Sequence, residues 1–251
     1  MSQNPNSDSL ITVIMAAGKG TRMRSDLAKV LHPLCGRPLI QYVVETAVAI
    51  HSSRILVIVG HQADAVREAL TPYPVEFVLQ QDLLGTGHAV MQAAPALSGF
   101  TGDLLVLAGD TPLVRPATLE NLVHYHRLEH AAATLLTARM DNPHGLGRII
   151  RGVDGQVTRI VEEKDAAPEE KNIREVNTSV YCFQAPLLLE LLGLLKPQNQ
   201  QKEYYLTDTI ALIRERELCI RGVETDRPEE TVGINTPEQL AAAETSLQRQ
   251  R

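Results

Sequence analysis

Three short segments of the chain combine glycine with side chains that can bind a nucleotide or a cation, and the first carries the most charge. It runs Ala16-Ala-Gly-Lys-Gly-Thr-Arg22, directly after a short run of apolar and β-branched residues. Gly18 and Gly20 permit backbone conformations in which successive N–H groups face a phosphate. Arg22 adds a planar set of donors suited to phosphate oxygens, and Lys29 adds a second positive charge.

A Gly-x-Gly pair considered alone is explained as well by a plain tight turn as by a ligand-binding loop. The neighbouring Lys and Arg favour a phosphate-binding loop, because open α/β sheets bind ligands at the carboxyl ends of their strands. The loop matches neither of two common nucleotide-binding patterns. A Rossmann fingerprint needs a third glycine where Met23 stands, and a Walker A loop needs Gly-Lys-Ser/Thr after four spacer residues.

The second segment ends an apolar run with a carboxylate, in the sequence Leu104-Leu-Val-Leu-Ala-Gly-Asp110-Thr-Pro112. Asp110 has two interpretations. It caps the turn before Pro112, or it is a ligand of Mg²⁺, which binds carboxylate oxygens together with substrate phosphates. A candidate phosphate loop earlier in the chain favours the metal ligand.

The third segment, Leu79-Gln-Gln-Asp-Leu-Leu-Gly-Thr-Gly-His88, follows another apolar run. Gln80 offers a paired donor and acceptor that match the edge of a base, and Gly85 and Thr86 allow a ligand to approach the backbone closely. Taken alone, the segment is also compatible with a loop that caps the following helix.

These segments require elements that hold them together, and the first half of the chain predicts alternating strands and helices. Continuous apolar runs predict buried strands, and apolar residues at intervals of three and four predict helices. The predicted strands are 11–15, 54–60, 75–80 and 103–110, and the predicted helices are 38–50, 63–70, 88–94 and 116–129. This alternation indicates a parallel sheet covered by helices on both faces.

The second half is richer in strands. Strands are predicted at 132–139, 147–151, 157–162, 175–184 and 218–223, and helices at 186–195, 207–217 and 237–248. We therefore expect an α/β fold with a mixed, mainly parallel sheet. Its expected parts are a disordered tail at 1–9, one domain at 10–240 with a nucleotide-binding half at about 10–130 and a smaller lobe at about 131–235, and a C-terminal helix or tail at 237–251.

With 44% hydrophobic and 22% charged residues, the composition excludes a disordered chain, collagen or a coiled coil as the main body. The 251 residues include 24 Lys and Arg against 30 Asp and Glu, which gives a net charge of −6. An acidic composition with 4% aromatic residues and no Trp disfavours nucleic-acid binding, which needs clustered Lys and Arg and, for single strands, aromatic stacking platforms. The first nine residues are polar and lack the basic n-region typical of a signal peptide, and the apolar run Leu10–Ala17 is shorter than the roughly 20 residues that span a bilayer. We expect a cytoplasmic protein with no nucleic-acid or membrane partner.

Three histidines, His124, His126 and His130, lie in or beside the predicted helix 116–129. His126 and His130 share a helix face, but the two histidines are not part of a wider pattern of metal ligands that would include carboxylates and water. We expect them on a solvated helix face.

A series of motifs follows the order found in one known family. The motifs are Met15-Ala-Ala-Gly-Lys-Gly-Thr-Arg-Met23, Lys29-Val-Leu-His32, Gln80, Leu84-Gly-Thr-Gly-His-Ala89, Gly109-Asp110-x-Pro-Leu113, Gly145-Leu-Gly-Arg148, Val161-Glu-Glu-Lys-Asp165, Glu175-Val-Asn-Thr178, Glu203-Tyr-Tyr-Leu-Thr-Asp208 and Val232-Gly-Ile-Asn235. From about residue 11 to 240 the chain resembles the uridylyltransferase domain of bifunctional N-acetylglucosamine-1-phosphate uridylyltransferase/glucosamine-1-phosphate acetyltransferases. The first motif is shared by all sugar nucleotidyltransferases, whereas the combination of Asn-Thr with Glu-Tyr-Tyr-x-Thr-Asp is more specific to this branch.

The resemblance implies a Rossmann-like, glycosyltransferase-A-like nucleotidyltransferase fold whose smaller lobe binds the sugar. The implied nucleotide contacts are Ala16, Ala17, Gly18, Gln80, Gly85 and Thr86. The implied catalytic residues, which hold the triphosphate, are Arg22 and Lys29. The implied sugar-pocket residues are Gly147, Glu162, Asn177, Tyr205 and Thr207. The implied Mg²⁺ ligands are Asp110 and Asn235.

Four positions depart from the family pattern. Leu83 stands where a second uracil-binding Gln is usual, and Ala108 stands where a Tyr is common. Ala28 replaces the Pro before Lys29, which we expect to loosen the loop that presents this lysine. Ser179 replaces a Gly, and we expect its side chain to narrow the sugar pocket.

The implied reaction joins UTP to N-acetylglucosamine 1-phosphate with Mg²⁺ as cofactor, and gives UDP-N-acetylglucosamine and pyrophosphate. Leu83 and Ser179 leave open another pair of substrates, dTTP or UTP with glucose 1-phosphate. A non-catalytic paralogue that senses a nucleotide sugar is the other alternative, opposed by the retained phosphate-binding and metal-binding residues. The family's acetyltransferase half is a C-terminal β-helix that forms trimers. The 251 residues accommodate one nucleotidyltransferase domain and a terminal helix, without the hexapeptide repeat of a β-helix. We therefore expect this chain to lack acetyltransferase activity and to be a monomer or weak homodimer.

Overall fold

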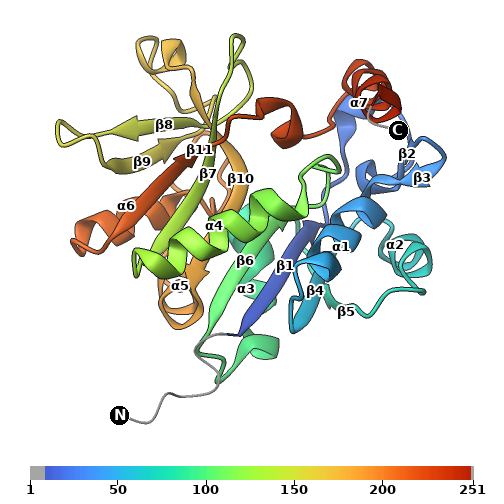
Figure 1. Cartoon of the computed structure of the whole chain (residues 1–251), viewed down its shortest axis with the longest axis horizontal. Helices are drawn as coiled ribbons and strands as arrows, with labels where there is room; N and C mark the ends of the chain where they lie inside the picture. The colour runs from blue at the N-terminus through green and yellow to red at the C-terminus, as the bar shows by residue number, and fades with distance from the viewer. Residues whose placement is uncertain (1–8, 250–251) are drawn as a thin grey trace.

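A computed structural model describes residues 9–249, in which one mixed sheet runs through the whole fold (Figure 1). The strand order is β11-β7-β10-β6-β1-β4-β5, and β8 and β9 extend the sheet beside β10. The disordered tail expected at residues 1–9 lies, apart from Ser9, outside the described residues. Within them no helix is both long enough and apolar enough to span a membrane.

The first half of the chain forms the parallel part of the sheet. Its strands are β1 (Leu10–Ala16), β4 (Arg54–Val59), β5 (Glu76–Leu79) and β6 (Asp103–Ala108). β1 pairs with β4 on one side and with β6 on the other, with Ile11 opposite Arg54 and Leu104. These strands are apolar almost throughout because helices cover both of their faces.

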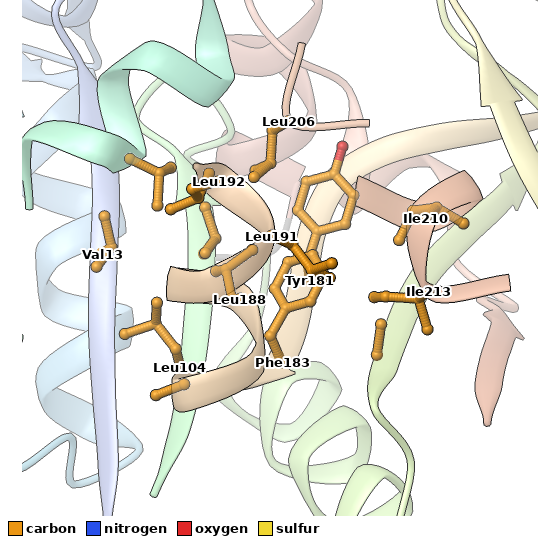
Figure 2. Close-up of a cluster of buried hydrophobic side chains, with 14 of the residues drawn as sticks. Val13, Leu104, Tyr181, Phe183, Leu188, Leu191, Leu192, Leu206, Ile210 and Ile213 are labelled. Carbon is orange, nitrogen blue, oxygen red and sulfur yellow. The ribbon is translucent and has the colours of Figure 1, made fainter. Parts of the chain in front are cut away.

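The helices lie on the two faces that alternate side chains of the strands define. One group comprises α1 (Leu39–Ala49), α2 (Ala63–Ala69) and α4 (Pro116–Leu128), and the other comprises α3 (Thr86–Gln92), α5 (Ala185–Leu192) and α6 (Asp208–Glu215). Leu105 and Leu107 of β6 pack with the first group, while Leu104 and Val106 pack with the second. Figure 2 shows the core on the second face, where α5 and α6 meet Tyr181 and Phe183.

The second half joins the sheet through an antiparallel strand. β10 (Glu175–Gln184) pairs with β6 and with β7 (Ala133–Arg139), and β11 (Ile220–Glu224) runs parallel to β7. β8 (Arg148–Arg151) and β9 (Val157–Val161) form a hairpin that pairs with β10 through β8. The predicted fold, a mixed and mostly parallel sheet with helices on both faces, is confirmed.

The last helix, α7 (Pro237–Arg249), returns to the first half of the chain (Figure 1). Ala243 is buried in a small apolar cluster with Met23, Leu34 and Leu39. The expected C-terminal helix is therefore part of the packed fold, and it rests beside the loop that carries Arg22. The sequence patterns did not predict the two-residue strands β2 (Pro33–Leu34) and β3 (Arg37–Pro38) or the short 3₁₀ helices η1 (Thr21–Met23), η2 (Lys29–Leu31), η3 (Ala94–Leu97), η4 (Glu170–Asn172) and η5 (Pro228–Thr231).

The prediction of a solvated histidine face on α4 is wrong for His126. Its side chain is 2% exposed, and its Nδ1 lies 2.9 Å from the hydroxyl of Thr134 on β7. The apolar residues of α4 seat the helix on β7, and His126 follows Leu122 by one helical turn on the same face. His124 and His130 are exposed, as expected.

Candidate active site

A cavity of about 740 Å³ opens where the carboxyl ends of β1 and β6 face the second half of the chain. All the site residues expected from the sequence line it except Tyr205 and Thr207. The cavity therefore brings together segments separated by more than 200 positions, from Ala16 to Asn235.

The loop after β1 forms the floor of the cavity at this edge of the sheet. Ala16 and Ala17 are buried, with no side chain beyond Cβ to obstruct a ligand. Gly20 has φ +69°, and a Cβ at this position would lie 2.4 Å from Cβ of Lys29. The chain can turn here and bring Lys29 into the site only with glycine at this position.

The charged groups of the first and last segments meet at one point. The Lys29 ammonium lies 2.5 Å from Oδ2 of Asp110 and donates to Oδ1 of Asn235 at 3.0 Å. Arg22 donates to the same Asn235 oxygen at 2.9 Å. Two cationic side chains thus converge with one carboxylate and one amide oxygen on the wall of the cavity.

Backbone contacts hold Asp110 and Asn235 together although they are far apart in the sequence. The N–H of Ile234 donates to the carbonyl of Asp110 at 2.8 Å. The segment before it is anchored by Glu230, which is 4% exposed and accepts a hydrogen bond of 2.7 Å from Thr118 at the start of α4.

The donor set at this point suits a hard divalent cation. Asp110 Oδ2 and Asn235 Oδ1 both face the same ammonium group, so they point toward a common position. Carboxylate and amide oxygens are the ligands that Mg²⁺ prefers, with waters and substrate phosphates in the remaining positions. Among residues 9–249 no cluster of three or more His, Cys, Asp or Glu side chains offers a fuller protein-only metal site.

A second region of the cavity surrounds Gln80, whose side chain is 3% exposed. Its Nε2 donates to the carbonyl of Gly85 at 3.2 Å and lies 3.0 Å from Nδ1 of His88. These contacts fix the plane of the Gln80 amide. The hydroxyl of Thr86 accepts a hydrogen bond of 3.1 Å from the N–H of Leu206, which ties this region to the second half.

The third region is built from β8, β9 and β10. A Cβ at Gly147 would lie 3.4 Å from both Asn177 Cβ and Glu162 Oε2, so these three residues are immediate neighbours. Thr207 lies behind them and donates to Oε1 of Glu162 at 3.0 Å. Burial raises the pKa of Glu162, the Thr207 hydrogen bond opposes that effect, and nearby carboxylates such as Asp208 reinforce it.

Asn177 is held in a fixed orientation by its own strand. Its Nδ2 donates to the hydroxyl of Tyr181 at 2.6 Å, and its Oδ1 accepts from the N–H of Ser179 at 3.2 Å. Ser179 adopts φ +60° at an irregularity of β10 and lines the cavity. This left-handed conformation favours glycine, the residue usual in the family that the sequence resembles.

Tyr205 is not a lining residue. Its hydroxyl lies 3.2 Å from Oδ2 of Asp165, and the side chain is 6% exposed. Tyr205 and Thr207 therefore support the wall of the cavity from behind.

Sequence reasoning missed Gln239, which lines the cavity from α7. Its Oε1 accepts hydrogen bonds from the N–H groups of Asn235 at 2.8 Å and Thr236 at 3.1 Å. Thr236-Pro-Glu-Gln239 has the Ser/Thr-x-x-Glu/Gln spacing of a capping box, and this signal was available in the sequence.

Residues 12–200 match the model of the MobA-like NTP transferase domain. The chain belongs to this family. The match confirms that the chain is a nucleotidyltransferase, as the first sequence motif predicted, and the cavity lies on the β1 and β6 edge of the MobA-like NTP transferase fold.

Curated relatives of this MobA-like NTP transferase carry the name "Bifunctional protein GlmU". The protein from Geobacter metallireducens is 50% identical over 235 residues, which are 93% of this chain and 49% of the relative. The protein from Pelobacter propionicus is 46% identical over 243 residues, which are 96% of this chain and 53% of the relative. The chain thus spans about half the length of the curated relatives it matches.

Two solved structures share the fold at lower identity. A UDP-glucose pyrophosphorylase complexed with UDP-glucose superposes with a TM-score of 0.75 at 18% identity, covering 97% of this chain and 100% of that one. A nucleotidyl transferase from Methanothermobacter thermautotroptrophicus gives a TM-score of 0.68 at 22% identity, covering 98% and 100%.

Proposed function

We propose that the chain is an N-acetylglucosamine-1-phosphate uridylyltransferase, which makes UDP-N-acetylglucosamine and pyrophosphate from UTP and N-acetylglucosamine 1-phosphate. The observation that carries the proposal is the convergence of Arg22, Lys29, Asp110 and Asn235 between a glycine-rich loop and a polar wall. The similarity to the bifunctional GlmU proteins supports the same conclusion.

In the proposed reaction an oxygen of the sugar phosphate attacks the α-phosphorus of UTP in line. A new P–O bond forms, the bond between the α-phosphorus and the oxygen that bridges to the β-phosphorus breaks, and pyrophosphate leaves with that electron pair. The ionised sugar phosphate is already a nucleophile, so no side chain has to supply one. Catalysis is then a matter of positioning and charge neutralisation.

Arg22 and Lys29 would bind the triphosphate oxygens together with backbone N–H groups of the loop after β1. Asp110 and Asn235 would hold Mg²⁺, which when bound neutralises charge on the phosphates. The donor chemistry of these two residues fits that ion, as described above.

Gln80 would bind the uracil edge. Because its Nε2 is engaged by Gly85 and His88, its Oε1 is the atom left to accept from the base. Ala16, Ala17, Gly18, Gly85 and Thr86 would line the rest of the nucleotide site, and Gly147, Glu162 and Asn177 would bind the amino sugar with Tyr205 and Thr207 behind them.

The test is pyrophosphate release across a matrix of UTP, dTTP, CTP, ATP and GTP against N-acetylglucosamine 1-phosphate, glucosamine 1-phosphate and glucose 1-phosphate. We expect the highest kcat/KM for UTP with N-acetylglucosamine 1-phosphate in the presence of Mg²⁺. A preference for another pair would overturn the substrate assignment. No release from any pair, with measurable binding of UDP-N-acetylglucosamine, would identify a sensor.

Arg22→Ala is expected to lower kcat/KM about 10- to 150-fold, since a charge-assisted hydrogen bond contributes roughly 1.5–3 kcal/mol. Asp110→Ala should cost more, because it removes the charged ligand of the proposed metal. Steady-state kinetics over a Mg²⁺ series measures both effects. Activity of Asp110→Ala near that of the unmodified protein would refute the metal assignment.

A further inference from the structure

The loop between β7 and β8 forms one wall of the proposed sugar pocket. Its residues Met140, Asn142 and 144–147 line the cavity. The carbonyl of Gly147 accepts the N–H of Asn177 at 2.9 Å, and Gly147 packs directly against Glu162. The position of this loop therefore sets the width of the pocket.

An ion pair between a buried arginine and a partly exposed glutamate holds the loop from behind. Arg148 is 1% exposed, and its Nη2 donates to Oε2 of Glu163 at 2.7 Å, while its Nη1 donates to the carbonyl of Leu146. The same Glu163 oxygen accepts the N–H of Gly145 at 3.0 Å. One carboxylate oxygen thus joins the guanidinium to the loop backbone.

Neither Arg148 nor Glu163 lines the cavity. The setting is an expensive one for the Arg148 charge, because its Nε is buried without a partner. Replacing such a pair by well-packed apolar residues is often neutral for stability, but an apolar pair could not donate to one carbonyl and accept from an amide of the same loop. Beside the backbone bond from Asn177 to Gly147, the polar pair therefore contributes a second restraint on the position of the loop.

We propose that Arg148 and Glu163 are positioning residues that fix the wall formed by 144–147 for the sugar 1-phosphate. This inference rests on the proposed function. When the pair is broken, the wall moves relative to Glu162 and Asn177, and an unpaired Glu163 carboxylate adds negative charge beside an anionic substrate. The site for UTP on the loop after β1 is untouched.

Two conservative variants test the pair. Arg148→Lys keeps the charge but loses the fork that reaches both Leu146 and Glu163. Glu163→Gln keeps the shape and an acceptor but loses the ion pair. Both should raise KM for N-acetylglucosamine 1-phosphate about tenfold or more, because small displacements of positioning groups are costly. KM for UTP should stay within about twofold, since none of its proposed contacts changes.

Arg139 and Glu224 provide a matched control. They form a two-bond ion pair of 3.0 Å and 3.0 Å at the end of β7, directly before the loop, with side chains 59% and 39% exposed. Arg139→Lys and Glu224→Gln should leave both KM values unchanged. A similar rise of the sugar KM in these controls would show that any change near the loop is enough, and would overturn the proposal.

Hydrogen exchange gives a readout that does not depend on turnover. The Gly145 N–H should exchange faster in Arg148→Lys and Glu163→Gln than in the unmodified protein, with protection of β6 retained. Faster exchange with unchanged sugar KM, or an equal rise of both KM values, would reduce the pair to a structural role and refute the proposal.

Failure of the proposed function and failure of the positioning role of Arg148 and Glu163 give different results. If the unmodified protein releases no pyrophosphate from any substrate pair, the proposed function fails. Calorimetric titration with UDP-N-acetylglucosamine then decides the inference, with about tenfold weaker binding expected for Glu163→Gln. Equal affinity of the two proteins would refute it.

Discussion

At the scale of single residues, the structure explains how Ala28 serves where the family pattern has proline. The N–H of Ala28 donates to Oε1 of Gln62 at 2.7 Å, and Gln62 also donates to the carbonyl of Asp26 at 2.9 Å. A proline has no N–H to donate. The loop that presents Lys29 is therefore restrained by a side-chain hydrogen bond in place of a ring, and the expected loosening is compensated.

A double-mutant cycle of Gln62→Ala and Ala28→Pro isolates this bond. Ala28 has φ −54°, which proline can adopt, so Ala28→Pro should fold. The loss of unfolding free energy caused by Gln62→Ala should be about 1 kcal/mol smaller in the Ala28→Pro protein than in the unmodified protein. The reason is that the Ala28→Pro protein already lacks the hydrogen bond to residue 28. Urea denaturation of the four proteins measures the coupling, and strict additivity would contradict the assignment.

Glu162 carries a second prediction at this scale, because burial raises its pKa. Between the ordinary glutamate pKa and the raised one, the unfolded chain binds fewer protons than the folded chain, so stability falls as pH rises through this window. Glu162→Gln removes the penalty. It should unfold at higher urea concentration than the unmodified protein near pH 7, and the difference should vanish below the ordinary glutamate pKa near 4.3.

The same substitution should weaken binding of the sugar 1-phosphate, because it replaces one oxygen of the Glu162 carboxyl group in the proposed pocket with an amide nitrogen, which cannot accept a hydrogen bond. A Glu162→Gln protein with lower stability at pH 7 would contradict the raised pKa. A protein with unchanged sugar KM would contradict the role of the carboxylate.

The phosphate loop, Asp110 and the segment around Gln80 were accessible from residue types and spacing, because they combine glycine, charged or amide side chains and strand ends. The sugar-pocket residues and Asn235 were accessible only through the family resemblance. The supporting residues were not identified by either means. Arg148 and Glu163 carry the same charges as any solvated pair, and only the folded hairpin of β8 and β9 shows that Arg148 is buried. Thr207 and Tyr205 lie in the neighbourhood expected of them, but periodicity cannot tell a residue in a wall from one behind it.

At the scale of elements, β6 has a cavity-lining carboxylate after one end and an ion-paired carboxylate at the other. Asp110 follows its carboxyl end and lines the cavity, whereas Asp103 begins the strand on the opposite edge. Burial alone would raise the pKa of Asp103, but hydrogen bonds and charges from His126 and Arg127 outweigh burial and lower the pKa. Arg127 donates to Oδ2 of Asp103 at 2.6 Å.

Asp103→Asn should lower the free energy of unfolding by about 1–3 kcal/mol near pH 7, since it removes hydrogen bonds between charged groups. Because the folded pKa is lowered, this stabilisation is complete above the ordinary aspartate pKa near 3.9 and is lost as pH falls through the folded value. Urea denaturation from about pH 3 to 7 should show the two proteins converging in acid. Catalytic constants should not change, and a loss of turnover would contradict a purely stabilising role of Asp103.

Strands and helices of ordinary length were predicted within a few residues, because the strands are buried runs and the helices have clear apolar stripes. The failures have local causes. The hairpin of β2 and β3 is held by two residues in each strand, too few for any periodicity. His126 is polar, yet it completes the packed face of α4 by bonding to Thr134.

At the scale of the whole molecule, α7 connects the end of the described chain to the cavity. Gln239 orients Asn235, and Ala243 packs on Met23 and Leu34 beside the Arg22 loop. The net charge of −6 does not oppose anionic ligands, because Arg22 and Lys29 supply positive charge where the cavity lies.

Ala243→Asp should release α7 from this cluster. A buried, unpaired carboxylate costs several kcal/mol, so we expect a loss of about 3 kcal/mol or more, or detachment of the helix. Activity should fall with it, since Asn235 loses its partner Gln239. Ala242→Asp is the control, because Ala242 is exposed on the same helix. Thermal denaturation and pyrophosphate release compare the two variants, and equal behaviour would contradict the packing of α7.

The place of β10 also decides the order in which the sheet is completed on the ribosome. β10 lies between β6 and β7, yet both are synthesised before it. While residues 109–174 emerge, β6 has its neighbour β1 on one side and an open edge on the other. Because open edges recruit other chains, we expect this interval to be one in which the nascent protein is prone to aggregation.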